Sequence, residues 1–392
     1  MTARRSPSPC PARQNRKIVS PPGTPLGSGA TPRELPIRDS LRNQRSYDAP
    51  QLAIPVRLNT NESPFPPAPA LIHDIAESIR EVAADLHRYP DREAVALRND
   101  LATYLTQRTG LAVHTSNVWA ANGSNEVLQH ILHVFGGPGR RVLSFAPSYS
   151  MYRIIAEGLG SEWMEIQRAE DFSLDMDHAV AMIAEHHPGV VIVTNPHSPT
   201  GHRLGTLELE RILHAAPGIV VIDEAYGEYS TTPSAIGLIN RFPMRVIVTR
   251  TLSKAFGFAG GRLGYLVAAP PVIDAMRLAR LPYHLSTITQ SAARAALRHA
   301  DQSLTLVSIV TAERSQVSKT LRQLDFEVFD SHANFLLFGR FADAPRAWRR
   351  YLDHGVLIRD VGTPHHLRVT IGTPEDNARF LEVSETLRAA GV

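Results

Sequence analysis

Residues 219–226 read IVVIDEAY, a short run of mostly β-branched apolar residues that ends in an aspartate. Runs that are apolar at nearly every position are typical of strands covered by helices on both faces. Segments with helical spacing separate this run from others of the same kind, at 142–145, 190–194, 246–249 and 263–267. The sequence therefore predicts an α/β fold with a mainly parallel central sheet.

The pattern of the sequence changes after Tyr283, where long helical stretches begin. These stretches precede short strand-like segments and a last helix that starts near Pro374. The change predicts a smaller α+β domain built from 286–392 together with 48–85, and a large domain at 86–285 that contains the parallel sheet. The four strand-like segments of the smaller domain are expected at 326–329, 334–338, 356–359 and 367–371.

Residues 1–47 differ from the rest of the chain in composition. They carry nine Lys or Arg against two acidic residues and eight of the 29 prolines, and no apolar period is sustained. This composition predicts a flexible basic arm. Because the formal charge of the whole chain is only +3, the remaining residues are slightly acidic, which argues against a nucleic-acid-binding face.

Composition also excludes several other classes of protein. The single cysteine, Cys10, allows neither an intrachain disulfide nor a cysteine-based zinc site, and it suits a reducing cytoplasm. No apolar run approaches the ~18 residues of a membrane helix. No apolar stretch follows the first charges as it does in a secretory signal. We therefore expect a cytoplasmic protein that binds no metal, no membrane and no nucleic acid.

Candidate chemistry lies where the strands are expected to end, because open α/β sheets bind ligands beyond the carboxyl ends of their strands. Asp223 ends one predicted strand, and Lys254 follows another in a small-residue loop. A buried carboxylate needs a partner. A protonated pyridine nitrogen is such a partner in enzymes whose lysine holds pyridoxal 5′-phosphate (PLP) as a Schiff base. Lys254 read alone would more readily be a solvated surface charge than a catalytic group.

Eleven motifs resemble those of the fold-type I PLP-dependent aminotransferases, and among them the branch that acts on histidinol phosphate. The resemblance runs from about Asp39 to the C-terminus. It implies a large PLP-binding domain with a mainly parallel sheet, a smaller α+β domain and PLP as cofactor. The motifs are RLNTNESPFPP, HRYPD, ANGSNE, APSYSMY, NPHSPTG, DEAYGEY, TRTLSKAFGFAGGRLGY, LPYHLS, ANFLLF, GVLIRD and LRVTIGTPEDN.

The resemblance also implies a role for each residue at the cofactor. Lys254 would bind PLP covalently and then move a proton of the substrate, while Asp223 would keep the pyridine nitrogen protonated. Tyr226 would donate to the phenolic oxygen of the cofactor, and Tyr149 would stack on the ring. The phosphate would be held at a helix N-terminus and by the lysine loop, through Ser124, Asn125, Ser253 and Arg262.

Substrate binding is assigned, again by resemblance, to the smaller domain. Arg368 would grip the α-carboxylate of the amino donor with its guanidinium fork, and Arg359 would bind the phosphate of histidinol phosphate. Tyr47 and Asn61 would line the same pocket. Tyr89 would reach the phosphate of the cofactor in a neighbouring subunit, which implies a homodimer with shared sites.

One position departs from the family pattern. The turn NPHSPTG has Ser198 where relatives carry an asparagine that hydrogen-bonds the phenolic oxygen of the cofactor. The shorter hydroxyl could act through a water molecule, or Tyr226 could make this contact alone. Either arrangement could change the pKa of the lysine–cofactor adduct.

These observations predict a PLP-dependent transaminase of histidine biosynthesis. Glutamate would supply the amino group, and imidazole-acetol phosphate would accept it to become L-histidinol phosphate. The alternative on the same fold is an aminotransferase for aromatic amino acids. A PLP-binding regulator with a DNA-binding head is a third possibility, but residues 1–47 lack the helical period and the length for such a head.

Overall fold

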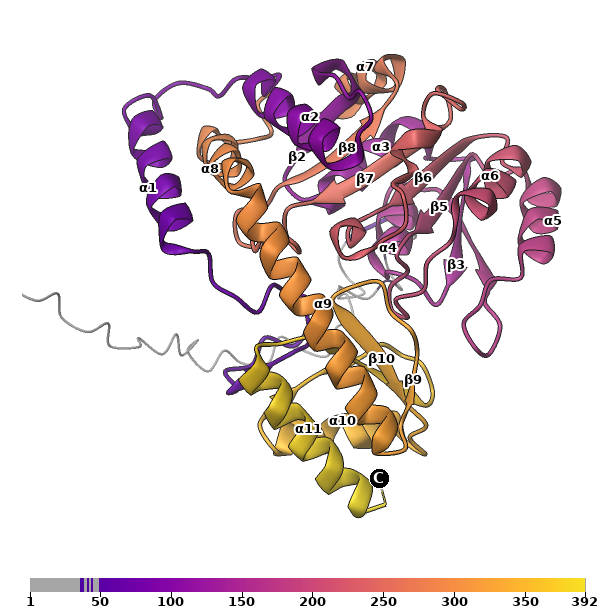
Figure 1. Ribbon diagram of the computed structural model, residues 1–392. Helices are drawn as coiled ribbons and strands as arrows, with labels where there is room; N and C mark the ends of the chain where they lie inside the picture. Colours follow the sequence, from indigo (N-terminus) through magenta and orange to yellow (C-terminus); the bar gives the residue numbers. More distant parts are fainter. Residues whose placement is uncertain (1–35, 39–40, 42–43, 45–48, 392) are drawn as a thin grey trace, which may run out of the picture. The chain divides into compact units, whose positions relative to one another are not determined.

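The computed structural model describes residues 36–38, 41, 44 and 49–391. The chain divides into two compact units, Met1–Ser46 and Tyr47–Val392. The second unit contains the helices and strands labelled in Figure 1. Most of the arm expected at 1–47, including Tyr47, lies outside the described residues.

A seven-stranded sheet forms the centre of this second unit, in the order β2-β8-β7-β6-β5-β3-β4. Strand β8 is antiparallel to both of its neighbours, and all the other pairs are parallel. The mainly parallel sheet expected from the sequence is therefore confirmed. Its strands are β2 (Val118–Ala121), β3 (Arg141–Ala146), β4 (Glu162–Gln167), β5 (Val190–Thr194), β6 (Ile219–Asp223), β7 (Val246–Thr251) and β8 (Gly264–Ala268).

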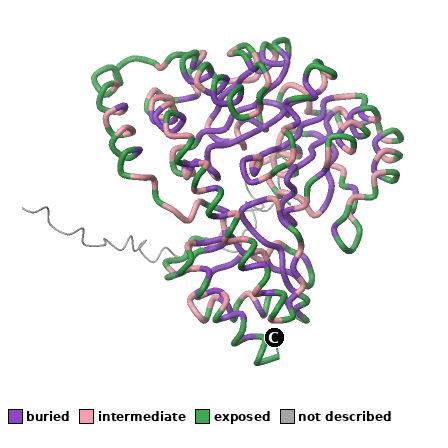
Figure 2. The backbone as a smooth tube through the Cα atoms, in the orientation of Figure 1, coloured by how far each residue is buried: buried purple, intermediate pink, exposed green. Residues whose placement is uncertain are grey.

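Helices cover the two faces of this sheet, and successive strand residues point into two separate cores. Val190 and Ile192 pack in the core with helices α3 (Ser124–Phe135), α4 (Met151–Gly158) and α7 (Pro270–Ala279). Val191 and Val193 face the opposite core, which contains residues of α2 (Val95–Thr109), α5 (Met176–His186) and α6 (Thr206–Ala215). Figure 2 shows the central strands buried along their length. This double covering explains why their sequences are apolar at most positions.

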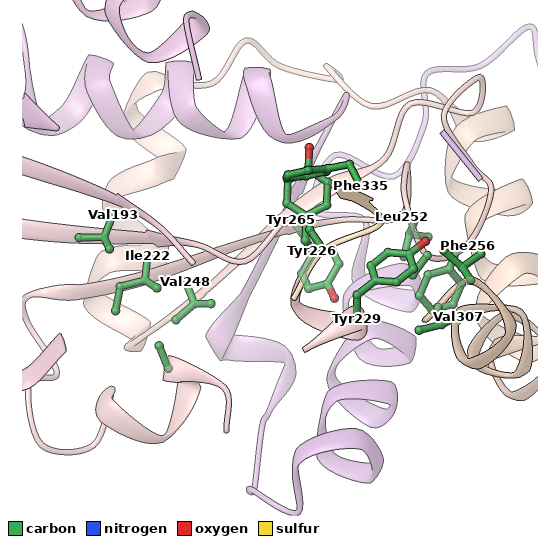
Figure 3. Packing of buried hydrophobic residues seen from close by; sticks show 14 of the residues in the cluster. Val193, Ile222, Tyr226, Tyr229, Val248, Leu252, Phe256, Tyr265, Val307 and Phe335 are labelled. Carbon is green, nitrogen blue, oxygen red and sulfur yellow. The ribbon is translucent and has the colours of Figure 1, made fainter. Parts of the chain in front are cut away.

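The register aligns Val193, Ile222 and Val248 in one row across β5, β6 and β7. Figure 3 shows these three side chains grouped together, apart from a second group that includes Tyr226 and Phe335. Because the register is fixed by apolar side chains on both faces, the carboxyl ends of these strands are held level at one edge.

A second sheet, of four antiparallel strands in the order β12-β13-β10-β9, lies in the C-terminal part. Helix α9 (Ala300–Gln323) packs on β9 and β10 and also contacts α11. The sheet consists of β9 (Glu327–Val328), β10 (Phe335–Gly339), β12 (Arg359–Asp360) and β13 (His366–Thr370), and it is accompanied by α10 (Ala344–Asp353) and α11 (Pro374–Ala389).

Residues 49–85 contact two elements that lie far from them in the sequence. Strand β1 (Val56–Arg57) pairs in parallel with β11 (Val356–Leu357), while α1 (Pro69–Ala83) packs along α8 (Thr287–Arg298). Three short 3₁₀ helices complete the described elements, at Thr115–Asn117, Gly227–Tyr229 and Ala235–Leu238.

Helix α2 begins at Val95, although aspartate, a residue type that often precedes the first turn of a helix, stands at position 91. Asp91 accepts hydrogen bonds from the backbone N–H groups of Glu93 and Val95, at 2.9 and 2.8 Å. Ala94 has a left-handed backbone conformation, with φ 46°. A right-handed helix cannot run through that residue, so the aspartate acts before the helix rather than inside it.

Candidate active site

A cavity of about 470 Å³ lies at the carboxyl ends of β3, β5, β6 and β7. Its position is the one that an open parallel sheet provides for a ligand. It brings together twelve of the residues singled out from the sequence: Asn61, Ser124, Asn125, Tyr149, Ser198, Asp223, Tyr226, Ser253, Lys254, Arg262, Arg359 and Arg368.

Asp223, the last residue of β6, is buried on the cavity wall. The sequence suggested that this carboxylate needs a cation, but the partners found are neutral donors. The Tyr152 hydroxyl donates to Oδ2 at 2.6 Å, and the Ala225 backbone N–H donates to Oδ1 at 3.1 Å. Burial raises the pKa of Asp223, and these hydrogen bonds oppose the rise. The carboxylate is thus stabilised on one side and remains open to the cavity.

Lys254 follows β7 and reaches the same cavity. Its Nζ donates to the Thr60 carbonyl oxygen at 2.9 Å. Desolvation, assisted by the positive charges of Arg368 and Arg262, lowers the pKa of Lys254 to about 8. A larger fraction of this amine than of an ordinary lysine is therefore neutral near physiological pH, and a nucleophile or base must be neutral.

Tyr226 connects the large sheet to the C-terminal sheet. Its hydroxyl accepts a 2.8 Å hydrogen bond from Asn61 Nδ2. The Asn61 backbone N–H and side-chain oxygen both bond the Thr370 hydroxyl at 3.0 Å, and Asn334 donates to the Asn61 carbonyl. Asn61 also has a left-handed backbone, with φ 56°. Strain of this kind persists where the surroundings fix it, often at functional sites.

The N-terminus of α3 forms another wall of the cavity. Gly123 provides no side chain to cap the first turn, so the backbone N–H groups that begin this helix are available to bind an anion. The guanidinium of Arg262 lies over Gly123, where an added Cβ would come within 2.4 Å of Nη2. Ser253 lines the cavity beside them.

These residues fit PLP. The helix N-terminus and Arg262 are suited to a phosphate, while Asp223 is suited to a protonated ring nitrogen and Lys254 to a carbonyl carbon. The donor set therefore matches the different groups of one cofactor.

Two arginines of the C-terminal sheet also line the cavity. Arg359 on β12 and Arg368 on β13 lie directly opposite each other in the antiparallel pair. Like charges placed in this way repel, and a bound anion relieves the repulsion. Arg368 Nη1 donates to Ser198 Oγ at 3.2 Å, so the residue that departs from the family pattern contacts an arginine of the cavity.

One described residue expected at the site, Tyr89, does not belong to the lining of this cavity. Tyr89 is 79% exposed and stacks on Tyr283, with ring centroids 4.5 Å apart; it does not line the cavity. Tyr47 lies outside the described residues.

The sequence interpretation missed Tyr152, Thr60 and Asp360, which also line the cavity. Tyr152 stands three residues after Tyr149 in the motif APSYSMY, and that helical spacing was the available signal for it. Thr60 contributes a backbone carbonyl, which no side-chain motif can reveal.

Among the described residues, no group of three His, Cys, Asp or Glu side chains is arranged to hold a metal ion. In the same part of the chain, no helix is both long and apolar enough to cross a membrane.

Fold and site together define an aminotransferase. The family model "Aminotransferase class I and II" matches residues 53–383, which is most of the chain.

The similar proteins narrow this class. A histidinol-phosphate aminotransferase of Nocardia farcinica is 64% identical over 371 residues, which cover 95% of this chain and 96% of that protein. Another, of Rhodococcus opacus, is 58% identical over 94% of this chain and 96% of its own length. The chain therefore belongs to the histidinol-phosphate aminotransferase family.

A solved structure agrees with this assignment. The crystal structure of histidinol-phosphate aminotransferase from Sinorhizobium meliloti, in complex with pyridoxal-5′-phosphate, has a TM-score of 0.77 and 25% sequence identity. The match covers 86% of this chain and 92% of that one.

Proposed function

We propose that this chain is a PLP-dependent transaminase that transfers the amino group of L-glutamate to imidazole-acetol phosphate, giving L-histidinol phosphate and 2-oxoglutarate. One observation carries the proposal: a single cavity is lined by the Asp223–Lys254 pair and by two arginines that lie opposite each other. The relatives that share most of its length carry the same activity in their names.

PLP, when bound, supplies a carbonyl that exchanges the amino group and a ring that accepts electron density. We infer that Asp223 holds a proton at the pyridine nitrogen, and that Tyr226 donates its hydroxyl proton toward the phenolic oxygen. Ser124, Asn125, Ser253 and Arg262 would bind the phosphate, and Tyr149 would cover the ring. Lys254 Nζ, once neutral, would take the proton from the substrate α-carbon.

The two arginines support a substrate pair that carries different anions. A guanidinium binds a carboxylate or a phosphate in bidentate fashion. We assign the glutamate α-carboxylate to Arg368 and the histidinol phosphate group to Arg359, with Asn61 and Tyr47 along the same wall. Ser198, which accepts from Arg368, would hold that side chain in place rather than contact the cofactor.

An absorbance titration of the PLP-loaded protein tests this function. L-histidinol phosphate, L-histidinol and L-phenylalanine are added in turn while the visible band of the lysine-bound cofactor is followed. We expect the phosphorylated compound to discharge the band at far lower concentration than the other two. Preference for phenylalanine would instead assign the chain to the aromatic aminotransferases. No described residue of the cavity specifically favours that alternative.

We further propose a homodimer in which Tyr89 completes the neighbouring site. Tyr89 is exposed and stacks on Tyr283, which is 42% exposed itself. Leu278 and Leu281, which precede Tyr283 in the sequence, are exposed as well, at 86% and 76%. A second copy of the chain would bury exposed apolar side chains of this kind.

Complementation tests the shared site. Lys254→Ala and Tyr89→Ala homodimers should both be impaired, whereas random subunit mixing should restore about a quarter of the native sites, since half of the dimers would carry one intact site. No recovery after mixing would contradict a shared site.

We also propose that the protein is located in the cytoplasm, which agrees with its single cysteine. Cell fractionation tests this location.

A further inference from the structure

Arg250 is a buried arginine of β7 that does not line the cavity but joins two segments that do. Its Nε and Nη2 donate to Glu224 Oε2 at 3.0 and 2.6 Å, and its Nη1 donates to Glu228 Oε1 at 2.9 Å. All three side chains are at most 4% exposed. One guanidinium thus holds two carboxylates away from water.

The two partners of Arg250 are close in the sequence to residues that line the cavity. Glu224 directly follows Asp223, and Glu228 comes two residues after Tyr226. Arg250 itself precedes Lys254 by four residues. The ion pairs therefore join the segment that contains Asp223 and Tyr226 to strand β7, which leads into the loop that contains Lys254.

A second contact joins the same two segments. The Tyr229 hydroxyl donates to the Lys254 carbonyl oxygen at 3.3 Å. Figure 3 shows Tyr229 near Phe256 and Leu252 of the lysine loop, with Tyr226 close by. Gly227 leaves room for the guanidinium, because an added Cβ would lie 3.1 Å from Arg250 Nη2. The 223–229 segment is consequently held to the 250–254 segment at several points.

Stability alone is a poor explanation for this cluster. Burying two carboxylates and one guanidinium costs much of their hydration, and apolar residues of similar volume often stabilise a fold equally well or better. What apolar residues cannot supply is direction, because charge-assisted hydrogen bonds from a planar guanidinium fix both distance and angle. Reacting groups must be held to within about 0.5 Å of their working geometry.

We propose that Arg250 is a positioning residue, which sets the separation of Asp223 and Tyr226 from Lys254 by holding Glu224 and Glu228. This inference rests on the proposed function, in which those three residues face the cofactor.

The test compares Arg250→Lys with Arg98→Lys. Lysine keeps the charge at 250 but cannot bond both carboxylates through a planar fork. Arg98 is a matched control, because it is 4% exposed and donates to the carbonyls of Val118 and Thr115 at 2.6 and 2.8 Å, outside the cavity. The thermal midpoint, the dissociation constant for PLP, the visible spectrum of the bound cofactor, kcat and KM are measured for both variants.

Both variants should lose thermal stability. For Arg250→Lys we expect the dissociation constant for PLP to rise about tenfold and kcat to fall up to about 100-fold, the effect of a misplacement of roughly 1 Å. The KM values should stay within about threefold, because the substrate arginines are untouched. Arg98→Lys should leave cofactor affinity and the visible spectrum as in the native protein. Identical behaviour of the two variants would overturn the proposal.

Glu228→Gln keeps the side-chain volume and one hydrogen-bond acceptor at position 228. It is therefore the second test variant if Arg250→Lys fails to fold. It should weaken PLP binding and alter the visible spectrum in the same direction, by a smaller factor. A lower thermal midpoint with unchanged PLP affinity and spectrum would contradict the proposal. Since these readouts use PLP alone, they are independent of the substrate: a native protein that binds PLP but ignores histidinol phosphate would refute the proposed function without deciding the role of Arg250.

Discussion

The Tyr152 hydroxyl donates a 2.6 Å hydrogen bond to Asp223 Oδ2 and also lies 2.9 Å from the Thr194 hydroxyl. Tyr152 comes from α4, whereas Asp223 and Thr194 end adjacent strands. Burial raises the pKa of the Asp223 carboxyl, and the hydrogen bond from Tyr152 acts against that rise. Tyr152 therefore favours the ionised carboxylate that a pyridine nitrogen would need opposite it.

Tyr152→Phe removes this hydrogen bond while keeping the aromatic ring. A hydrogen bond to a charged group contributes about 2 kcal/mol, so the pKa of Asp223 should rise and the affinity for PLP should fall by about tenfold or more. Equilibrium dialysis of PLP against both proteins measures the change. Unaltered affinity would mean that the Ala225 backbone N–H suffices to keep the carboxylate ionised.

The sheet could be predicted from sequence because its inner strands are apolar on both faces. Strands β2 and β4 were not predicted: β2 has only four residues, and β4 lies at the sheet edge with a mixed sequence, EWMEIQ. An edge strand keeps partial contact with water, so no continuous apolar run marks it.

The site could be predicted only in part, for a different reason. Motif resemblance picked out residues that touch a ligand, such as Lys254 and Arg359, and the cavity contains them. It did not pick out Tyr152 or Arg250, whose partners are distant in the sequence and are identified only by the tertiary fold. Tyr89 does not line the cavity of its own chain, and a single chain cannot place it.

Arg359→Ala should separate phosphorylated from unphosphorylated substrates. Loss of a charge-assisted bidentate contact should lower kcat/KM for L-histidinol phosphate about 100-fold and that for L-histidinol by no more than about threefold. Steady-state kinetics with both amino donors measures the ratio. Arg349→Ala, at an exposed position of α10, is the control and should change neither value. Equal losses on both substrates would refute a phosphate role for Arg359.

Capture of PLP by the apoprotein should depend on pH through Lys254. The pKa of Lys254 is lowered to about 8, first by desolvation and next by the charge of Arg368. Only the neutral amine attacks a carbonyl, so the rate should rise with pH through about 8 and then level off. In Arg368→Gln one positive charge is gone, which favours the protonated amine; the midpoint should move upward by about one pH unit or less. Stopped-flow absorbance follows the reaction, and a midpoint that moves downward would contradict the electrostatic argument.

Gly264→Ala should displace the N-terminus of α3, where we expect the cofactor phosphate to bind. A Cβ at Gly264 would come within 2.2 Å of the Ser124 backbone nitrogen and 2.3 Å of the Gly123 carbonyl carbon, and neither backbone atom can yield as a flexible side chain would. Overpacking of this kind costs about 1–3 kcal/mol, so the thermal midpoint should fall by a few °C. PLP affinity should fall with it, because the N-terminus of α3 is displaced. Gly260→Ala, in the glycine-rich loop that precedes β8, is the matched control, since no atom lies within 4 Å of its added Cβ. If Gly264→Ala lowers the midpoint but binds PLP as the native protein does, the first turn of α3 is not where the phosphate is held.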